Sequence, residues 1–374
     1  MRSSSVSRLS PQSPTNTAMN TWVKYCVGID VSKDLLEVCF SQMDSQQTVS
    51  VKATSTFANR LGGWKSLCRW IKRLSTQDLP LWLVMEATGV YYEGAAYYLK
   101  SQNYQVSVVL PNKSKNYMKS LNIKSKTDAL EARALAQMGL ERKMKAWQGY
   151  TPIMLLLKRL CRERQTLVED KVAVQNQVHA HKHAQQPDRK IIQRALQRIR
   201  LLEKQIQEID QQVGSTLKQA PDLKAKIDQV CTLKGVSILT AVTIISETNG
   251  FELIQNKAQL VSYAGYDVVE RTSGTTVKGK SRISKKGNAY IRRALHYPAL
   301  SAARFDPNLN ALYERVLKRN PKVKMIGLVA VQRKILVLIY TLFKNNTVYD
   351  PNYANRKASE LHKNRQELSP AYTA

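Results

Sequence analysis

Acidic residues are scarce in this chain, and long uncharged apolar runs are absent. Its 374 residues include 58 Lys and Arg against 28 Asp and Glu, which gives a net charge of +30. Such an imbalance adds self-repulsion without helping folding, so it favours a polyanionic partner. The basic residues are spread along the whole chain, which indicates an extended nucleic-acid interface. Because no run of 18 uncharged apolar residues occurs, we expect neither a membrane span nor a membrane partner.

Cysteine and histidine are also few, with five of each. The cysteines form no CxxC pair and lie in or beside apolar runs, which is typical of reduced core residues in an intracellular protein. His179, His181 and His183 alternate within a polar segment, where a solvated helix is a better interpretation than a zinc site. Residues 1–20 are rich in Ser, Gln, Asn and Thr and lack the apolar core of a secretion signal, so we expect a disordered leader over residues 1–21.

The first third of the chain alternates between strand-like and helix-like patterns. Short apolar runs predict strands at residues 23–29, 35–40, 48–53, 81–86 and 105–110. Helical periodicity predicts helices over residues 57–74 and 91–100 and from Asp128 onward, with a basic loop around Lys113, Lys115 and Lys119. Three strands, then helix, strand, helix, strand and helix, is the order of a ribonuclease-H-like (RuvC-like) α/β domain. We assign this domain to residues 22–147.

Four acids lie at informative places in that pattern. Asp30 and Glu86 end the first and fourth strands, while Asp128 and Glu131 share one face of the last helix. Each acid alone is better explained as a surface residue. In a ribonuclease-H-like fold, however, these element ends converge on one cleft, where carboxylates would repel unless a cation lay between them. Oxygen ligands of this kind predict a site for Mg²⁺, with Mn²⁺ as the alternative.

The rest of the chain is expected to be all-α. Residues 148–220 are dominated by Gln, Arg, Lys and Glu, with apolar residues at helical spacing and Pro187 between two helices. They predict an antiparallel helical hairpin or coiled-coil arm, serving as a spacer or dimer contact. Residues 221–350 predict a mainly helical domain that closes with an amphipathic helix over residues 325–343, and residues 351–374 a polar tail. Gly235 and its neighbours resemble a helix-hairpin-helix element, although Ser237 replaces the usual second glycine.

A basic segment in this last domain is the clearest candidate nucleic-acid interface. Glycine and serine between its basic residues leave the backbone accessible to a nucleic acid. Arg271 and Lys126 are further candidate residues. Its basic residues are Lys278, Lys280, Arg282, Lys285, Lys286, Arg292 and Arg293. Ser273 lies in the same loop and could attack phosphorus if a base or metal activated it. From spacing alone, a turn or phosphate-contacting role is the better interpretation, because Thr272, Thr275 and Thr276 beside it would serve equally well.

The chain resembles the DEDD-type insertion-sequence transposases of the IS110 family, which act as bridge-RNA-guided recombinases. The match runs from about residue 22 to 345, in order and over both domains. The matching motifs are Gly28-Ile29-Asp30-Val31-Ser32-Lys33, Met85-Glu86-Ala87-Thr88-Gly89, Lys126-Thr127-Asp128 with Ala132-Arg133, Tyr263-Ala264-Gly265, Ser273-Gly274, and Gly279 through Arg282-Ile283-Ser284-Lys285 to Gly287-Asn288 with Arg292-Arg293-Ala294-Leu295.

The resemblance implies a DNA recombinase in a prokaryotic cytoplasm, associated with the nucleoid. It implies that Ser273 is a nucleophile that links covalently to a DNA end. The acids and the serine would meet in a homo-oligomer, either a dimer or a tetramer, and a structured guide RNA would select donor and target DNA. The family usually has Asp where this chain has Glu131. Because Glu is an equally good oxygen ligand with a longer reach, we expect activity to survive.

Two other functions compete with that prediction. A Mg²⁺-dependent, junction-resolving nuclease would use the same acids, hydrolyse DNA and leave Ser273 only a phosphate contact. A non-catalytic nucleic-acid-binding protein would leave the four acids unexplained in a chain of charge +30. A recombinase forms a covalent protein–DNA adduct and the nuclease does not. Replacing Asp30 or Asp128 by Asn should abolish either enzymatic activity but leave nucleic-acid binding by a non-catalytic protein intact.

Overall fold

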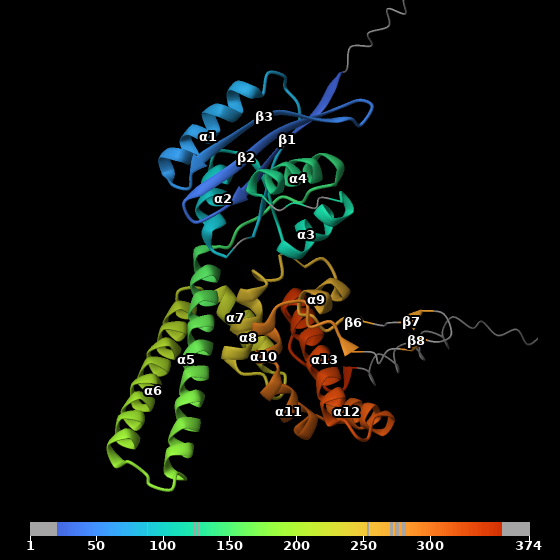
Figure 1. The fold of residues 1–374 in the computed structure, drawn as a ribbon. Coiled ribbons are helices and arrows are strands. Elements are labelled where there is room, and N and C mark those ends of the chain that lie inside the picture. Colours follow the sequence, from blue (N-terminus) through green and yellow to red (C-terminus); the bar gives the residue numbers. More distant parts are fainter. Residues whose placement is uncertain are drawn as a thin grey trace, which may run out of the picture. The chain divides into compact units, whose positions relative to one another are not determined.

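The computed structural model describes residues 21–87, 89–122, 125, 127–252, 254–269, 272–273, 277–278 and 282–353 (Figure 1). The chain divides into two compact units, Met1–Gly149 (unit 1) and Tyr150–Ala374 (unit 2). The leader expected over residues 1–21 lies outside the described residues except for Thr21, and so does the expected tail beyond residue 353.

Unit 1 is built on a five-stranded mixed sheet of order β3-β2-β1-β4-β5. Its strands are β1 (Trp22–Val31), β2 (Leu35–Asp44), β3 (Val49–Ala58), β4 (Leu81–Glu86) and β5 (Gln105–Val109). The first three strands pair antiparallel, while β4 runs parallel to both β1 and β5. This is the strand order of a ribonuclease-H-like sheet, and all five predicted strands are confirmed.

Helices cover both faces of this sheet. They are α1 (Leu61–Leu74), α2 (Tyr91–Ser101), α3 (Pro111–Ser120) and α4 (Asp128–Glu141). Successive side chains of a strand point to opposite faces, so β1 divides its residues between two cores. Tyr25, Val27 and Ile29 pack with α1 and α2, whereas Cys26 packs with α4. Asp30 therefore belongs by alternation to the face that α4 covers.

A glycine lets α4 approach β1 very closely. A Cβ atom on Gly28 would lie 2.0 Å from the carbonyl oxygen of Ala132 and 2.3 Å from the amide nitrogen of Ala136. Both alanines are buried with Cys39 of β2. Small residues on each side thus bring the backbone of the helix almost onto the strand, and the first turn of α4 comes to lie near the end of β1.

Two element predictions in unit 1 are wrong. The stretch with Lys113, Lys115 and Lys119 is helix α3 and not a loop. Pro111 occupies its first turn, where a fixed φ suits a helix and the missing amide is not needed. The third strand continues to Ala58, so the next helix begins at Leu61 and not at residue 57. The cause is tertiary pairing, since β3 stays in register with β2 up to the pair Leu35 and Ala58.

Unit 2 begins with the predicted helical hairpin. Helices α5 (Pro152–Lys182) and α6 (Arg189–Lys218) lie side by side and antiparallel, and Pro187 falls in the connection between them (Figure 1). The side chains of Thr151 and Asp188 cap their first turns. Arg164 of α5 binds Asp210 of α6 through two hydrogen bonds of 2.6 and 3.2 Å.

The remainder of unit 2 is a helical core with short strands. The helices are α7 (Pro221–Cys231), α8 (Ile238–Glu247), α9 (Lys257–Tyr263), α10 (Ala289–Ala294), α11 (His296–Phe305), α12 (Pro307–Arg319) and α13 (Lys324–Asn345). The strands are β6 (Val268–Val269), β7 (Thr272–Ser273), β8 (Val277–Lys278) and β9 (Arg282–Ile283). Helix α13 is long and apolar enough to cross a membrane by length and composition alone. Its Val331, Ile335 and Ile339 are 0% exposed in the core of unit 2, and this position accounts for its composition.

We predict that Gly28→Ala lowers the free energy of unfolding by about 3 kcal/mol, because its methyl group would collide with the backbone of α4 and not with a movable side chain. Urea denaturation measures the change. Gly62→Ala is the matched control, since nothing lies within 4 Å of a Cβ atom there, and it should be neutral or slightly stabilising. Equal stability of the two variants would contradict the close packing of α4 on β1.

Candidate active site

Two strand ends bring Asp30 and Glu86 together. The parallel register pairs Gly28 with Val84 and Ile29 with Met85, so one further step places Asp30 beside Glu86. Val84 belongs to the core under α4, and a Cβ atom on Gly139 of α4 would lie 2.7 Å from it. Because side chains alternate along a strand, Glu86 shares the α4 face with Val84. Both carboxylates therefore lie on the side of the sheet that α4 covers.

The first turn of α4 supplies the other two acids. Thr127 caps the helix by accepting a 3.3 Å hydrogen bond from the amide of Leu130. Asp128 and Glu131 follow within that turn, where the positive end of the helix dipole favours carboxylates. Asp128 is exposed and Glu131 is half-buried.

The four acids form one electrostatic group around Asp30. The pKa of Asp30 is raised from 3.8 to about 6; partial burial is the largest cause, and the charges of Glu131, Asp128 and Glu86 contribute the rest. The structure thus brings together all four acids that the sequence singled out. Among the described residues, however, no group of three or more acidic, histidine or cysteine side chains is placed so that it could hold a metal ion. The carboxylates are close enough to affect the pKa of Asp30, but they do not form a metal-coordination site by themselves.

Ser114 is a neighbour of these acids that sequence reasoning missed. It lies on α3, is only 2% exposed, and its hydroxyl lies within hydrogen-bond reach of the Glu86 carboxylate and of the Pro111 carbonyl at 2.9 Å. A hydroxyl has one proton to donate, and the charged carboxylate is the stronger acceptor. Ser114 can therefore fix the orientation of Glu86. The mistaken loop prediction for this segment hid its role.

Ser273 lies in unit 2, in a segment that folds back on itself as paired short strands. Val268 pairs with Ile283 and Val269 with Arg282, and further along Thr272 pairs with Lys278 and Ser273 with Val277. We call the described residues between 264 and 287 the serine hairpin. Arg271 and Lys280 of the candidate nucleic-acid interface lie outside the described residues, as does Lys126 of unit 1.

The described basic residues near the serine hairpin fall into two groups. Arg282, Lys285 and Lys286 are exposed. Arg292 donates a 2.8 Å hydrogen bond to the carbonyl of Ala264, and Arg293 forms a 2.8 Å ion pair with Glu169 of α5. The first group suits contacts with a phosphate backbone, whereas the second group has partners within unit 2.

The turn between α7 and α8 has a structural explanation for its unusual sequence. Gly235 has a φ of +88°, and a Cβ atom there would lie 2.8 Å from the carbonyl oxygen of Pro298 on α11. Ser237, which replaces the usual second glycine, caps α8 by accepting a 3.2 Å hydrogen bond from the amide of Thr240. That this turn contacts a phosphate backbone stays a prediction.

Two family models match the chain on either side of the α5–α6 connection. A DEDD-type IS110 transposase model matches residues 27–182, and a transposase model of the IS116/IS110/IS902 family matches residues 227–314. The chain belongs to the IS110 family of transposases. The first match contains the four acids and the second contains Ser273, so the family resemblance seen in the motifs is confirmed. This IS110 transposase is accordingly an enzyme that acts on DNA.

Two relatives of this IS110 transposase align with most of its length. The pilin gene-inverting proteins of Moraxella bovis and Moraxella lacunata are each 26% identical over 333 residues, which cover 87% of this chain and 98% of theirs. Among solved structures, Thermus thermophilus RuvC aligns with 33% of this chain and 99% of its own, at 10% identity and a TM-score of 0.26. At that TM-score the likeness supports no inference about function.

We predict that Asp30→Asn stabilises the metal-free IS110 transposase at neutral pH. A carboxyl whose pKa rises on folding from 3.8 to about 6 binds its proton more tightly in the folded state. Its ionisation therefore costs no stability below pH 3.8, costs more as the pH rises towards 6, and costs a constant amount above. Allowing for partial exposure, the gain at pH 7.5 should be about 1–2 kcal/mol.

Urea denaturation in the presence of a chelator, from pH 4.5 to 7.5, measures this gain. The difference between Asp30→Asn and wild type should shrink as the pH falls below 6. Asp34→Asn, at an exposed position in the β1–β2 turn, is the control and should match wild type throughout. An Asp30→Asn variant that is less stable than wild type at pH 7.5 would show that burial and the neighbouring acids do not destabilise the ionised Asp30.

Proposed function

We propose that this IS110 transposase cuts and rejoins DNA strands through a covalent intermediate on Ser273, aided by a divalent cation that Asp30, Glu86, Asp128 and Glu131 hold. The observation that carries the proposal is the convergence of four acids in a protein of net charge +30. Clustered carboxylates destabilise one another, so a chain with few acids does not gain from gathering four of them unless they bind a cation.

The chemistry of the four acids fits Mg²⁺. They offer only carboxylate oxygens, the donors that Mg²⁺ prefers, and Mn²⁺ accepts the same set. A bound Mg²⁺ would supply Lewis-acid polarisation of the oxygens of a phosphodiester. The residues of this chain hold and orient that set: the helix dipole of α4 supports Asp128 and Glu131, and Ser114 orients Glu86.

The proposed covalent step exchanges one phosphodiester for another. The Oγ of Ser273 attacks phosphorus, an Oγ–P bond forms, and the P–O bond to one deoxyribose breaks. A base takes the hydroxyl proton of the serine, and the departing sugar oxygen acquires a proton. Reversal with a different sugar hydroxyl joins a new strand and releases the serine. The number of phosphodiester bonds is conserved, so strand exchange needs no further source of energy.

Full-length relatives support rearrangement rather than simple cutting. The Moraxella relatives are named for inverting a pilin gene, and an inversion needs rejoining as well as cleavage. We propose that this chain, as a transposase, likewise cuts and rejoins both donor and target DNA. Several strands must be cut and held, for which we propose a homodimer or homotetramer. The charge of +30 and the exposed basic residues near the serine hairpin suit a second polyanion, the structured guide RNA that the family resemblance implies.

We propose matching roles for the parts of the chain. Residues 22–147 would act as the RuvC-like domain, 148–220 as an arm that serves as spacer or dimer contact, and 221–350 as the domain that carries the nucleophile. The competing function, a metal-dependent junction-resolving nuclease, is favoured by one feature: the four acids lie in unit 1 and could hydrolyse DNA without any serine.

We predict a protein–DNA adduct that depends on Ser273 and on Mg²⁺. The purified protein, RNA from the DNA that flanks its element, Mg²⁺ and a nicked suicide substrate should give a slow-migrating band on a denaturing gel. Ser273→Ala should abolish the band, and so should a chelator. Thr272→Ala, one position away in β7, is the matched control and should keep it. Cleavage that persists in Ser273→Ala without any adduct would establish the nuclease instead.

We predict that the rate of adduct formation depends more on the negative charge at position 131 than on the length of that side chain. Glu131→Asp keeps the charge and shortens the reach by one methylene, so the rate of adduct formation should stay within about tenfold of wild type. Glu131→Gln removes the charge and should lower that rate by about 100-fold or more. The same gel, quantified over time, measures both rates. Wild-type activity in Glu131→Gln would remove this residue from the proposed ligand set.

A further inference from the structure

Glu247 occupies a costly position in unit 2. It is the last residue of α8 and is 0% exposed. The negative end of a helix dipole disfavours a carboxylate, and burial removes the hydration that a charge would otherwise keep. A glutamate tolerated at such a place must have strong compensating partners, and the identity of those partners shows what the residue connects.

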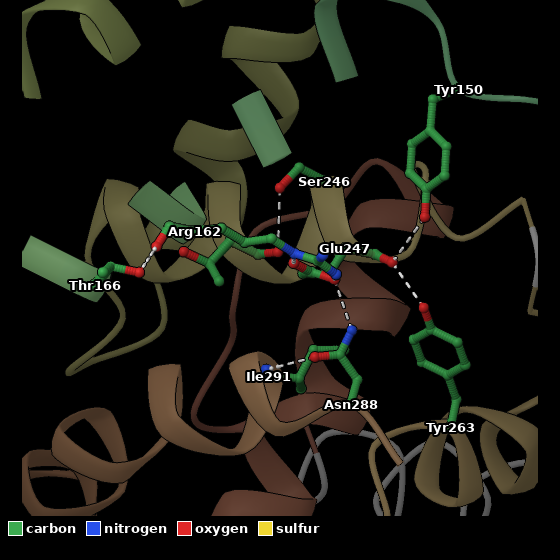
Figure 2. Close-up of polar contacts among 9 residues, drawn as sticks. Tyr150, Arg162, Thr166, Ser246, Glu247, Tyr263, Asn288 and Ile291 are labelled. Atoms are coloured by element: carbon green, nitrogen blue, oxygen red, sulfur yellow. Dashed lines mark hydrogen bonds and ion pairs between the residues drawn. The ribbon is translucent and has the colours of Figure 1, made fainter. Parts of the chain in front are cut away.

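Two side chains from distant elements bind its carboxylate (Figure 2). Arg162 of α5 donates through Nε to Oε1 at 2.6 Å and through Nη2 to Oε2 at 2.9 Å. Asn288 donates through Nδ2 to Oε2 at 2.7 Å. The hydrogen bonds to Glu247 are the largest cause that raises the pKa of Arg162. Charge-assisted bonds of this geometry are strong and directional.

The backbone of Glu247 reaches the other end of the serine hairpin. Its carbonyl accepts a 3.0 Å hydrogen bond from the hydroxyl of Tyr263, which ends α9 (Figure 2). Tyr263 immediately precedes the serine hairpin, and Asn288 immediately follows it. The backbone N–H of Asn288 donates a 2.8 Å hydrogen bond to the carbonyl of Tyr263. Glu247 therefore holds both ends of the segment that carries Ser273.

The base of the serine hairpin leaves no room for adjustment. Gly265 has a φ of +74°. A Cβ atom on Gly287 would lie 2.5 Å from both the Gly265 amide nitrogen and the Tyr263 carbonyl oxygen. The Lys285 amide closes the base with a 3.1 Å hydrogen bond to the Gly265 carbonyl. Backbone packed directly on backbone leaves the two ends of the serine hairpin little freedom to shift against each other.

Helix α5 is tied to this base through more than one contact. The guanidinium of Arg162 lies over the ring of Tyr290, the second residue of α10, 4.5 Å from its centroid. Glu169, two turns further along α5, pairs with Arg293 of α10 at 2.8 Å. The first helix of the helical hairpin is thus connected to both the buried carboxylate and the element that follows the serine hairpin.

We propose that Arg162, Glu247 and Asn288 form a positioning network that fixes the serine hairpin, and with it Ser273, relative to α5. This role rests on the proposed function, because it is the placement of a nucleophile that the network controls. A nucleophile displaced by about 1 Å can lose about 100-fold in rate. A partner that binds the arm α5–α6 and shifts α5 would shift the serine hairpin through this network. The rate of attack by Ser273 would then depend on what the arm binds.

Two mild variants test the network without leaving an isolated buried charge. Asn288→Ser keeps a residue able to cap α10 but removes the amide donor to Glu247. Arg162→Lys keeps the positive charge but loses the two-point bond and the contact over Tyr290. Arg164→Met is the matched control, because it removes an equally two-pronged ion pair from α5, to Asp210, that does not touch the serine hairpin.

Two measurements are made on the full-length protein with its RNA and DNA. We expect both network variants to lower the rate of Ser273 adduct formation about 10- to 100-fold while retention of DNA at equilibrium changes less than about twofold. Hydrogen exchange should become about tenfold faster or more at the amides of Ser284, Lys285 and Asn288, and stay unchanged at core residues of α13 such as Ile335. Arg164→Met should match wild type in both measurements.

Each other outcome overturns the inference. Unchanged exchange at the hairpin base would show that the network does not hold it. Faster exchange in α13 as well would show a general contribution to folding, and faster exchange at the base alone with a wild-type adduct rate would show that Ser273 is positioned by something else. A wild-type protein that forms no adduct would overturn the proposed serine chemistry separately, and the exchange data would still decide whether the network holds the hairpin.

Discussion

The repulsion among four carboxylates is the constraint around which unit 1 is arranged. Asp30 and Glu86 can meet Asp128 and Glu131 only because α4 lies almost in contact with the backbone of β1 at Gly28. The small residues that permit this approach bring like charges together, and partial burial together with these charges raises the pKa of Asp30. The sheet presents these carboxylates together at the ends of two parallel strands, and the proposed binding of a divalent cation would offset their repulsion.

Glu247 in unit 2 and the four acids of unit 1 have opposite surroundings. Glu247 in unit 2 is fully buried, yet Arg162 and Asn288 satisfy its carboxylate, so its charge is used within the protein. In unit 1 the charged side chains that most affect Asp30 among the described residues are other acids. The first arrangement is that of a structural ion pair, and the second is the one that we propose holds a cation. This contrast separates the proposed positioning network from the proposed cation site.

The sequence predicted the features that depend on local pattern. Alternating apolar residues and terminal acids were enough to locate the strands that carry Asp30 and Glu86, and the spacing of Asp128 and Glu131 was enough to place them on one helix face. Tertiary contacts decided the rest. Ser114 was missed because a Lys-rich segment reads as a loop until α4 packs beside it. Glu247 was missed because its partners lie 85 and 41 residues away, at Arg162 and Asn288, and no local pattern links them. Likewise, no local pattern indicates that Arg292 and Arg293, which the sequence assigns to the nucleic-acid interface, also have partners within unit 2.

The most direct test of the carboxylate site is a titration of Mn²⁺ into the full-length protein, with the free ion followed by electron paramagnetic resonance. We predict that wild type and Asp34→Asn remove Mn²⁺ from solution to the same extent, and that Asp30→Asn and Asp128→Asn each weaken binding at least about tenfold, because each removes one anionic ligand from the set. Equal binding by all four proteins would contradict the central claim that these acids have been gathered to hold a divalent cation.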